Sequence, residues 1–253
     1  MYAPERYRSI VERVMGMGRA SVVDLADDLD VTPETIRRDL SELERQGLLR
    51  RVHGGAVPAG SVGFEPSVDS RSHVLVSQKD RIARAAIAEL PQAGAVIIDS
   101  GTTTGRLISI IPDDRELTVV TDSVSHALAL ANKVNINVML LGGRVRGSTL
   151  STVDQWALAS LESVYADVAL IGTNGISIER GLTTPDQAEA MVKRAMLNSA
   201  KRKVIMADHS KFNEDHFAQF GDLTDIDVVI TDTDANKKAV TSIRELGVSV
   251  VET

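Results

Sequence analysis

Seven short apolar runs, most of them separated by helical stretches, dominate the chain from residue 77 onward. Such alternation of strand and helix restricts the fold to a mostly parallel sheet that is covered by helices on both faces. The expected strands span residues 95–99, 117–121, 137–141, 167–172, 203–208, 227–232 and 248–251. We therefore expect an α/β domain over residues 76–253.

The first 57 residues carry a different pattern. Apolar residues at helical spacing predict three helices, over residues 5–17, 22–29 and 33–46. Ser21 and Thr32 are expected to cap the second and third of them, with Pro33 at the first position of the third. A strand over 48–52, a His53-Gly54-Gly55 turn and a return strand over 56–57 follow. Together these elements predict a winged helix-turn-helix over residues 1–57, and the Pro- and Gly-containing segment 58–75 is expected to be a linker.

Composition excludes several classes of protein. No stretch approaches the roughly 20 uncharged apolar residues of a membrane-spanning helix. Charges occupy the N-terminal positions where a signal peptide has its apolar run, so we expect a cytoplasmic protein. The chain has no cysteine, which excludes disulfides, thiolate nucleophiles and zinc–thiolate sites. Only eight aromatic residues disfavour a single-strand binder that stacks bases.

The distribution of charge is compatible with DNA binding although the net charge is −7. Residues 1–60 carry nine arginines and ten acidic residues, a net charge of −1, and the remainder carries −6. Five of the nine arginines fall between Arg37 and Arg51. Clustered arginines, rather than net charge, mark a nucleic-acid interface.

The third predicted helix has one apolar and one polar face. Ile36, Leu40 and Leu43 share the apolar stripe, whereas the opposite face is polar near the N-terminus, as in helices that enter the major groove. An ordinary surface helix would show the same pattern, but the preceding helices and the basic hairpin favour DNA. The candidate DNA-binding residues are Thr32, Glu34, Thr35, Arg37, Arg38, Ser41, Arg50, Arg51 and His53. Asp39 lies just off this face and is expected to orient an arginine or cap a backbone group.

The residues of this region resemble a known family. Segments 31–40, VTPETIRRDL, and 47–56, GLLRRVHGGA, are similar to the DeoR family of bacterial transcription regulators. The resemblance implies a repressor that binds a double-stranded DNA operator as a homo-oligomer, a dimer or a tetramer. Two winged helices would then occupy repeated half-sites.

Polar turns follow the predicted strands of the second domain. Asp99-Ser100-Gly101-Thr102-Thr103-Thr104 lies between a strand and a helix, where backbone N–H groups can hold a phosphate. Hydroxyl residues at such a turn can equally be plain helix caps. Further turns begin at Thr121, Gly142, Gly172 and Asp208, and ligands of open α/β sheets bind where such loops converge. Lys193, Arg144, Arg146 and Lys211 could supply positive charge.

These turns are also similar to the DeoR sensor domain. The resemblance implies a fold related to ribose-phosphate isomerases that senses a phosphorylated sugar, with no other cofactor. Segments 172–175 and 181–186 are closest to actinobacterial regulators of fructose and phosphotransferase-sugar genes. The candidate effector-binding residues are Asp99, Ser100, Gly101, Thr102, Thr103, Thr104, Thr121, Gly143, Arg144, Asn174, Gly175, Glu189, Lys193 and Lys211.

Two interpretations remain open for Glu189 and Lys193: they bind the effector, or they form a structural ion pair on the surface of their helix. Their i,i+4 spacing is typical of a surface ion pair worth about 0.2–0.5 kcal/mol, on a helix that Thr184 is expected to cap with Pro185 at its first position.

Two residues depart from the family pattern. Asp122 stands where Asn is common and is expected to meet sugar hydroxyls or nothing. Asp154 stands where Gly is common and could cap the following helix.

The alternative function is a sugar-phosphate isomerase with an attached DNA-binding domain. Asp99, Asp186, Glu189 and Asp208 could move protons. Asn174 opposes this alternative, because it occupies a loop in which the isomerases are expected to carry an acidic pair. We therefore expect no enzymatic activity. The five histidines, at positions 53, 73, 126, 209 and 216, show no spacing typical of metal ligands, so no metal site is expected.

Overall fold

The computed structural model describes residues 2–52, 54–58 and 67–253. Within it the chain divides into two compact units, Met1–Val76 and Ser77–Thr253. Residues 59–66 of the proposed linker, 58–75, lie outside the described part, and the helix α4 (Val68–Ser72) occupies some of the remainder. No helix of the described residues is long and apolar enough to span a membrane.

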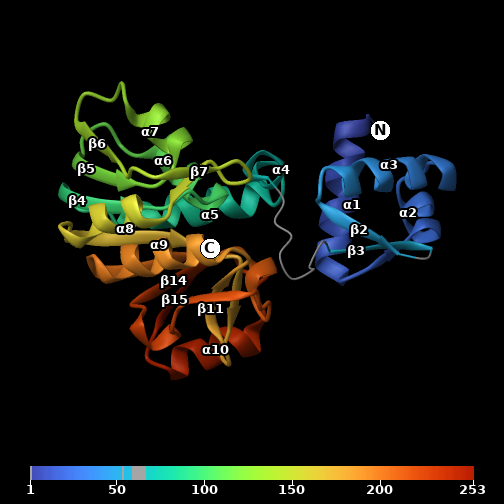
Figure 1. Ribbon diagram of the computed structural model, residues 1–253. Helices are drawn as coiled ribbons and strands as arrows, with labels where there is room; N and C mark the ends of the chain where they lie inside the picture. The colour runs from blue at the N-terminus through green and yellow to red at the C-terminus, as the bar shows by residue number, and fades with distance from the viewer. Residues whose placement is uncertain (1, 53, 59–66) are drawn as a thin grey trace. The chain divides into compact units, whose positions relative to one another are not determined.

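The N-terminal unit is a winged helix. Its helices are α1 (Ala3–Met17), α2 (Val22–Asp28) and α3 (Pro33–Arg45), and its sheet contains β1 (Ala20–Ser21), β2 (Leu49–Val52) and β3 (Gly55–Pro58) in the order β1-β3-β2 (Figure 1). All three predicted helices and the hairpin are confirmed. The short strand β1 was not predicted.

Buried side chains from α1, α2, α3 and the sheet form the core of this unit. The largest of them are Ile10, Leu25, Ile36, Leu40, Leu43 and Leu49. Gly55 is required where β3 pairs with β1, because a Cβ atom there would lie 2.1 Å from the Ala20 carbonyl oxygen. The core residues of α3 are therefore the apolar stripe that its sequence indicates, and its polar face remains outside the core.

The second unit is built on a seven-stranded parallel sheet. Its strands are β4 (Ala93–Ile98), β5 (Glu116–Thr121), β6 (Ile136–Leu140), β9 (Ala166–Gly172), β12 (Ala200–Met206), β14 (Val228–Thr231) and β15 (Ser249–Glu252). Each of the seven predicted strands is confirmed. The strands lie in the order β15-β14-β12-β9-β4-β5-β6, so the order reverses between β4 and β9.

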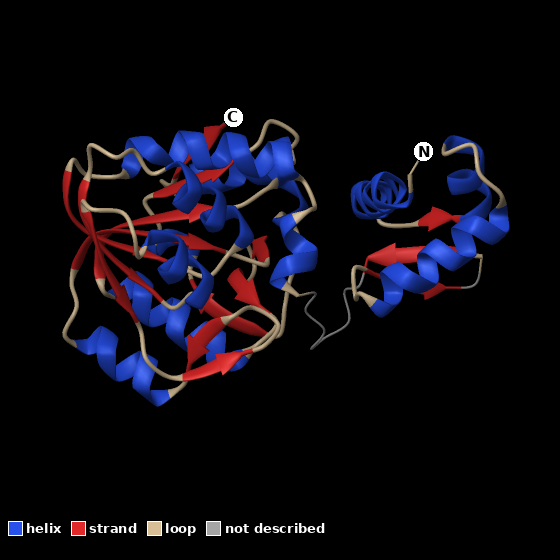
Figure 2. Cartoon of the chain, turned by 90° about the horizontal axis from the view of Figure 1, so that it is seen from above, coloured by secondary structure: helices blue, strands red, loops and turns tan. Residues whose placement is uncertain are grey.

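Helices cover both faces of this sheet (Figure 2). The first face packs against α5 (Val76–Ala86), α6 (Thr102–Ile110) and α7 (Val124–Leu130), and the second against α8 (Gln155–Glu162), α9 (Gln187–Asn198) and α10 (Lys237–Glu245). Strand β9 is buried on both sides. Val168 and Leu170 lie in the core under the first group of helices, and Ala169 and Ile171 lie in the core under the second group.

Short elements complete the unit. Three strands, β10 (Gly175–Ser177), β11 (Gly181–Thr184) and β13 (Ala218–Gly221), form an antiparallel sheet, and β7 (Arg144–Arg146) pairs with β8 (Ser151–Val153). Single 3-10 turns span Ile87–Glu89, His209–Lys211 and Leu223–Asp225. The sequence did not predict the antiparallel sheet or the β7–β8 hairpin, whose strands are only three or four residues long.

Candidate DNA-binding and effector sites

Helix α3 begins as its sequence indicates. The Thr32 hydroxyl accepts a hydrogen bond from the Thr35 backbone N–H at 3.2 Å, and Pro33 occupies the first helical position. The side chains of Glu34, Arg37, Arg38 and Ser41 are exposed, whereas Thr35 is half-buried. The helix thus presents an exposed polar face near its N-terminus, the part that helix-turn-helix proteins place in the major groove.

The arginines of this face differ in their partners. Arg37 forms an ion pair with Glu34, and Arg45 pairs with Glu42. Arg38 is exposed and makes no ion pair with any residue that the structure describes. Arg38 is therefore the arginine of α3 that can approach a base edge without first breaking a contact within the protein.

The wing strand β2 is attached to α3 by hydrogen bonds. Arg51 donates from Nη1 to the Ser41 hydroxyl at 2.8 Å, and its backbone N–H donates to Glu44 Oε1 at 2.8 Å. Arg50 is exposed on the same strand. His53, predicted at the tip of the wing, lies outside the described residues. The hydrogen bonds fix the basic strand relative to α3.

Asp39 has the structural role that its position indicates. Its carboxylate is buried and accepts hydrogen bonds from Nε and Nη2 of Arg6 in α1, the latter at 3.1 Å. This hydrogen bonding raises the pKa of Arg6. The prediction that Asp39 orients an arginine is confirmed, and the pair joins α1 to α3.

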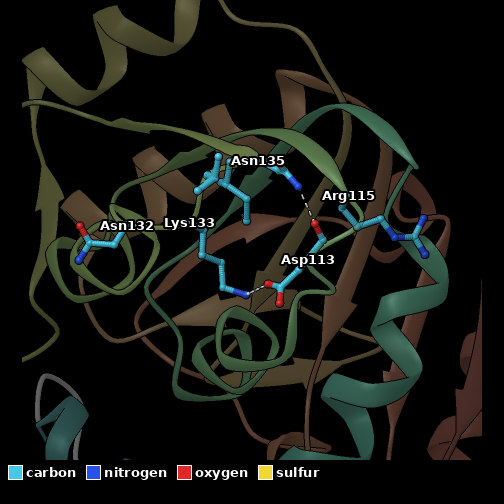
Figure 3. Close-up of a pocket in the computed structure, with 7 residues that line it drawn as sticks. Asp113, Arg115, Asn132, Lys133 and Asn135 are labelled. Carbon is cyan, nitrogen blue, oxygen red and sulfur yellow. Dashed lines mark hydrogen bonds and ion pairs between the residues drawn. The ribbon is translucent and has the colours of Figure 1, made fainter.

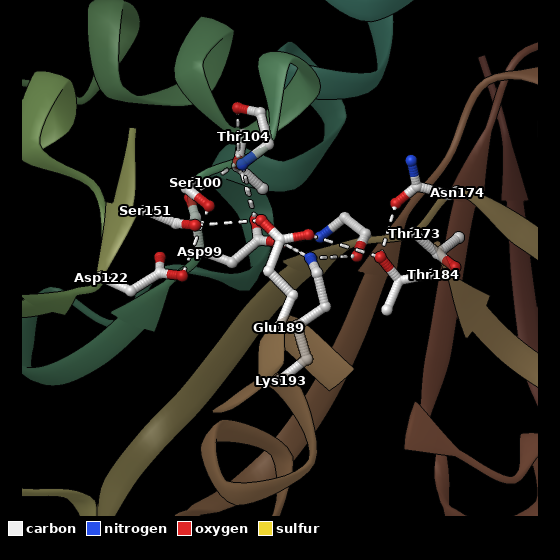
Figure 4. A network of polar contacts seen from close by, with 12 residues as sticks. Asp99, Ser100, Thr104, Asp122, Ser151, Thr173, Asn174, Thr184, Glu189 and Lys193 are labelled. Carbon is white, nitrogen blue, oxygen red and sulfur yellow. Dashed lines mark hydrogen bonds and ion pairs between the residues drawn. The ribbon is translucent and has the colours of Figure 1, made fainter. Parts of the chain in front are cut away.

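The reversal of strand order between β4 and β9 positions the second site. Asp99 follows β4 and is fully buried. Its carboxylate accepts hydrogen bonds from the Gly172 backbone N–H at 3.0 Å, from the Thr104 hydroxyl at 2.8 Å and from the Gly101 N–H at 3.2 Å. Asp99 therefore joins the end of β9 to the β4–α6 loop, at the point where open α/β sheets bind their ligands (Figure 4).

Lys193 of α9 completes this junction. Its buried ammonium group donates to Asp99 Oδ2 and to the Gly172 carbonyl at 2.9 Å, and lies 5.6 Å from the centre of the Phe220 ring. Burial lowers the pKa of Lys193, but Asp99 and Glu189 outweigh that effect and raise it overall. The interpretation as a surface pair of Glu189 and Lys193 is wrong, because both side chains are buried and Lys193 is bonded to Asp99 instead.

Glu189 is held one turn away on α9. Its carboxylate accepts a hydrogen bond from the Ser151 hydroxyl at 2.9 Å and pairs with Arg146 at 3.1 Å. The expected start of this helix at Thr184 is also wrong. Thr184 ends β11, and Asp186 caps α9 by accepting a hydrogen bond from the Glu189 N–H at 2.9 Å. Asp186, and not Thr184, caps the helix because its carboxylate reaches a backbone N–H group of the first turn directly.

The β4–α6 loop presents free backbone donors. Helix α6 has Gly101 as its N-cap, and no side chain caps it. Its first-turn N–H groups, those of Thr102 and Thr103 among them, therefore have no partner within the helix. Thr104 points inward to Asp99, whereas Gly101 and Thr102 are half-exposed and Ser100 and Thr103 are buried. Unpaired N–H groups at the start of a helix are the kind of donors that bind anions.

A further loop approaches from the antiparallel sheet. The Asn174 side-chain oxygen accepts a hydrogen bond from the Thr184 hydroxyl at 3.1 Å, and its backbone carbonyl lies 3.2 Å from His216 Nε2. Asn174 is half-buried, and Gly175 begins β10. Asn174 thus neighbours Glu189 through Thr184, as Figure 4 shows. Sequence reasoning did not assign Thr184, His216 or Ser151 to this site. Thr184 and Ser151 reach it from the short strands β11 and β8, and His216 from the segment that precedes β13.

Four predicted effector residues form no hydrogen bond with Asp99, Glu189 or Lys193 among the described residues. Arg144 is exposed and forms an ion pair with Asp154. Gly143 has a φ of +137°, and a Cβ atom added to it would lie 2.4 Å from the Val153 carbonyl oxygen. Thr121 is fully buried and accepts from the Ser123 N–H at 3.1 Å. Among the described residues, Lys211 forms no hydrogen bond or ion pair with Asp99, Lys193 or Glu189.

Asp154 does not cap α8 with its side chain. It occupies the N-cap position at φ of +76° and ψ of −167°, which glycine tolerates best, and no side-chain capping hydrogen bond forms. Its carboxylate instead accepts from Arg144 Nε at 2.7 Å. The interpretation of Asp154 as a cap is therefore wrong, because the left-handed backbone directs the side chain to the β7 strand.

Two other features lie outside this site. A pocket of about 280 Å³ is lined by Asp113, Arg115 and residues 132–136, and contains none of the predicted effector residues (Figure 3). His209, Asp232 and Asp234 each place one possible ligand atom within 4.8 Å of the others. His209 Nδ1 lies 2.8 Å from Asp232 Oδ1, and this hydrogen bond raises the pKa of His209.

The two units match two parts of one protein family. Residues 6–61 match the DeoR-like helix-turn-helix domain, and residues 75–233 match the DeoR C-terminal sensor domain. The chain belongs to the DeoR family. As a DeoR-family protein it is a transcription regulator that combines a DNA-binding domain with a sensor domain. The family that the sequence resemblance indicated is thus confirmed.

Curated relatives support this assignment over the whole chain. The HTH-type transcriptional regulator GlpR of Haloferax volcanii is 39% identical over 252 residues, which cover 100% of this chain and 98% of the relative. The glycerol-3-phosphate regulon repressor of Escherichia coli is 31% identical, with 92% of each chain covered. The transcriptional repressor GlcR of Bacillus subtilis is 32% identical, with 100% of this chain and 97% of the relative covered. These relatives are regulators and not enzymes.

Solved structures resemble this DeoR-family chain only distantly. Ribose 5-phosphate isomerase A of Neisseria gonorrhoeae is 18% identical, with a TM-score of 0.38 and about half of each chain covered (53% and 52%). The sorbitol operon regulator SorC of Klebsiella pneumoniae is 12% identical, with a TM-score of 0.39 and coverage of 82% and 91%.

Proposed function

We propose that this DeoR-family regulator is a sequence-specific repressor of genes for sugar or polyol uptake and catabolism, and that a phosphorylated sugar or polyol releases it from DNA. The observation that carries the proposal is the occurrence in one chain of the exposed polar face of α3 and the uncapped first turn of α6. The names of relatives support the ligand class, since one is a repressor of a glycerol-3-phosphate regulon. Such a protein acts on chromosomal DNA and is therefore cytoplasmic.

At the DNA, Arg38 reads a base and the wing contacts the backbone. An unpaired arginine on α3 can bind guanine O6 and N7 with two hydrogen bonds. Arg50 and Arg51 on β2 contact phosphates, which adds affinity without sequence preference. Helix-turn-helix proteins bind paired half-sites as symmetric oligomers, so a homodimer or homotetramer is the functional form.

At the sensor, neutral donors rather than free cations hold the phosphate. Lys193 and Arg146 are already paired with Asp99 and Glu189, so they offer little uncompensated positive charge. The N–H groups of Thr102 and Thr103 and the N-terminal dipole of the nine-residue α6 supply the attraction. Asn174 and Glu189, which the Thr184 hydroxyl links, contact hydroxyl groups of the ligand.

Binding of labelled DNA tests this function. Fluorescence anisotropy with the DNA upstream of the regulator's own gene should show tighter binding than a scrambled fragment of equal length. Addition of sn-glycerol 3-phosphate, fructose 1-phosphate or fructose 6-phosphate should identify a phosphate ester that raises the Kd, while the unphosphorylated compound has no effect.

A pair of variants at Thr102 locates the response in the sensor. Thr102→Asp places a negative charge in the first turn of α6, where helices accept acidic residues, and should abolish the ligand response while DNA binding persists. Thr102→Ser is the matched control and should keep the response. Equal responses in both variants would place the phosphate elsewhere.

A further inference from the structure

Asp122 has an unsatisfied oxygen at the edge of the effector site. It directly follows β5, and its side chain is buried, with only 2% of the residue exposed. Oδ2 accepts a hydrogen bond from the Ser100 hydroxyl at 3.3 Å, as Figure 4 shows. Oδ1 is equally buried and has no hydrogen-bond partner among the residues that the structure describes. A buried polar atom without a partner is rare in proteins and calls for an explanation.

The charged groups around Asp122 oppose its ionisation. Asp99 and Glu189 are carboxylates, and the nearby cation, Lys193, is bonded to Asp99 and to a backbone carbonyl. His126 on α7 is also buried, and burial lowers its pKa to about 4, so it adds no positive charge at neutral pH. Burial, and then Asp99, raise the pKa of Asp122 well above its ordinary value.

A neutral carboxyl group changes the hydrogen bonding that Asp122 can offer. A protonated carboxyl has one O–H donor in addition to its acceptors. Because Oδ2 already accepts from Ser100, the proton belongs on Oδ1, the oxygen that has no partner. Ser100 immediately precedes Gly101, the N-cap of α6, so the hydrogen bond to Ser100 holds the Asp122 carboxyl group beside the loop that leads into α6.

We propose that Asp122 is a ligand-binding residue that acts as a neutral carboxylic acid and donates a hydrogen bond from Oδ1 to a phosphate oxygen of the effector. This inference rests on the proposed function, because it requires a phosphorylated ligand at the first turn of α6. Ionisation of Asp122 removes the donor and places a negative charge beside the phosphate. Ligand binding is therefore linked to the protonation of one side chain, and weakens as the pH rises.

The protonation of Asp122 can be tested in the full chain without ligand. A carboxyl group whose folded pKa is raised stabilises the fold below its unfolded pKa, and that stability is lost as pH rises toward the folded pKa. Asp122→Asn keeps the shape and cannot ionise. The free energy of unfolding, measured from pH 4 to pH 9, should therefore fall in the wild type relative to Asp122→Asn as the pH rises.

Asp208 provides the matched control. It is also a buried aspartate that follows a strand of the same sheet, β12, but Lys211 and Lys79 outweigh burial and lower its pKa. Above pH 5 the stability of Asp208→Asn should differ from that of the wild type by a constant amount. A constant difference for Asp122→Asn as well would show that Asp122 is ionised, and would overturn the inference.

Calorimetric titration with sn-glycerol 3-phosphate tests the hydrogen bond to the ligand. Between pH 7 and pH 10 a phosphate monoester is almost entirely dianionic, so its own titration does not interfere. The wild-type Kd should rise at least tenfold over this range, whereas the Kd of Asp122→Asn, whose amide remains a donor, should change less than twofold beyond any change shared with Asp208→Asn. Asp122→Ala should bind weakly at every pH.

The remaining outcomes separate this inference from the proposed function. If wild type and Asp122→Asn bind with the same affinity and the same pH dependence, the donor role is overturned while phosphate binding stands. If neither sn-glycerol 3-phosphate nor inorganic phosphate binds any variant at any pH, the proposed effector class and the ligand role of Asp122 both fail. The unfolding curves then still report whether Asp122 is protonated.

Discussion

Lys193 donates to the Asp99 carboxylate and to the Gly172 carbonyl, and so joins α9 to the ends of β4 and β9, where the strand order of the sheet reverses. The pair is buried on both sides. It fixes the geometry of the loops around the candidate effector site, and in the proposed function the backbone of α6 binds the phosphate. Lys193 is thus a structural residue first.

Removal of Lys193 should therefore unfold the sensor more easily. Lys193→Met leaves Asp99 charged and uncompensated in the interior, which typically costs about 3–5 kcal/mol. Lys237→Met, which removes an exposed partner of Glu252, should cost less than about 1 kcal/mol. Chemical denaturation of the full chain measures both. Similar losses for the two variants would contradict the structural role of Lys193.

The Arg6–Asp39 pair should be equally important to the winged helix. Asp39→Ala leaves Arg6, whose side chain is only 11% exposed, without its carboxylate partner, and should destabilise the N-terminal unit by about 3 kcal/mol. Asp28→Ala breaks an exposed pair with Arg13 and should cost less than about 1 kcal/mol. Hydrogen exchange of the amides of α1 and α3 follows this unit separately. Unchanged protection in Asp39→Ala would refute the prediction.

Two arginines should separate base reading from backbone contact. Arg38→Ala should weaken specific DNA binding by about 1–3 kcal/mol and relax the preference at one base pair. Arg51→Ala should weaken binding to every sequence alike and reduce the salt dependence. Arg45→Ala, at the far end of α3, is the control and should change binding little. Equal losses on specific and scrambled DNA for Arg38→Ala would exclude base reading by Arg38.

Asp154 should be replaceable by glycine with a gain in stability. Its backbone conformation costs a non-glycine residue on the order of 1–3 kcal/mol, whereas the exposed ion pair with Arg144 contributes at most about 1 kcal/mol. Asp154→Gly should raise the free energy of unfolding, and Asp154→Ala, which loses the pair but keeps the strain, should lower it slightly. A loss in the glycine variant would mean that the ion pair outweighs the strain.

The main elements could be predicted because their signals are local. The seven strands are apolar runs with turn residues behind them, and the caps Ser21 and Thr32 act within one turn of their own helices. The same reasoning placed Asp39 beside an arginine. It could not name Arg6, since that residue lies 33 positions away and only the packing of α1 on α3 brings it close.

The site was harder to predict because its contacts are long-range. Asp99 and Lys193 are 94 residues apart, so the spacing of Glu189 and Lys193 pointed to the wrong partner. Ser151 and Thr184 lie on short strands whose length gives no clear periodicity, yet both reach Glu189. The start of α9 was misplaced for a local reason, because a Thr-Pro pair and an aspartate two residues later both fit a helix cap.

The most direct test of a ligand-controlled repressor is the Kd for its operator in the presence of a phosphate ester and of the parent compound. With full-length protein and labelled upstream DNA, a phosphate ester that acts through α6 should raise the Kd at least tenfold, and its parent sugar or polyol should leave the Kd unchanged. Thr102→Asp should bind the same DNA and ignore both compounds. Specific DNA binding that no phosphate ester alters in the wild type would contradict the account.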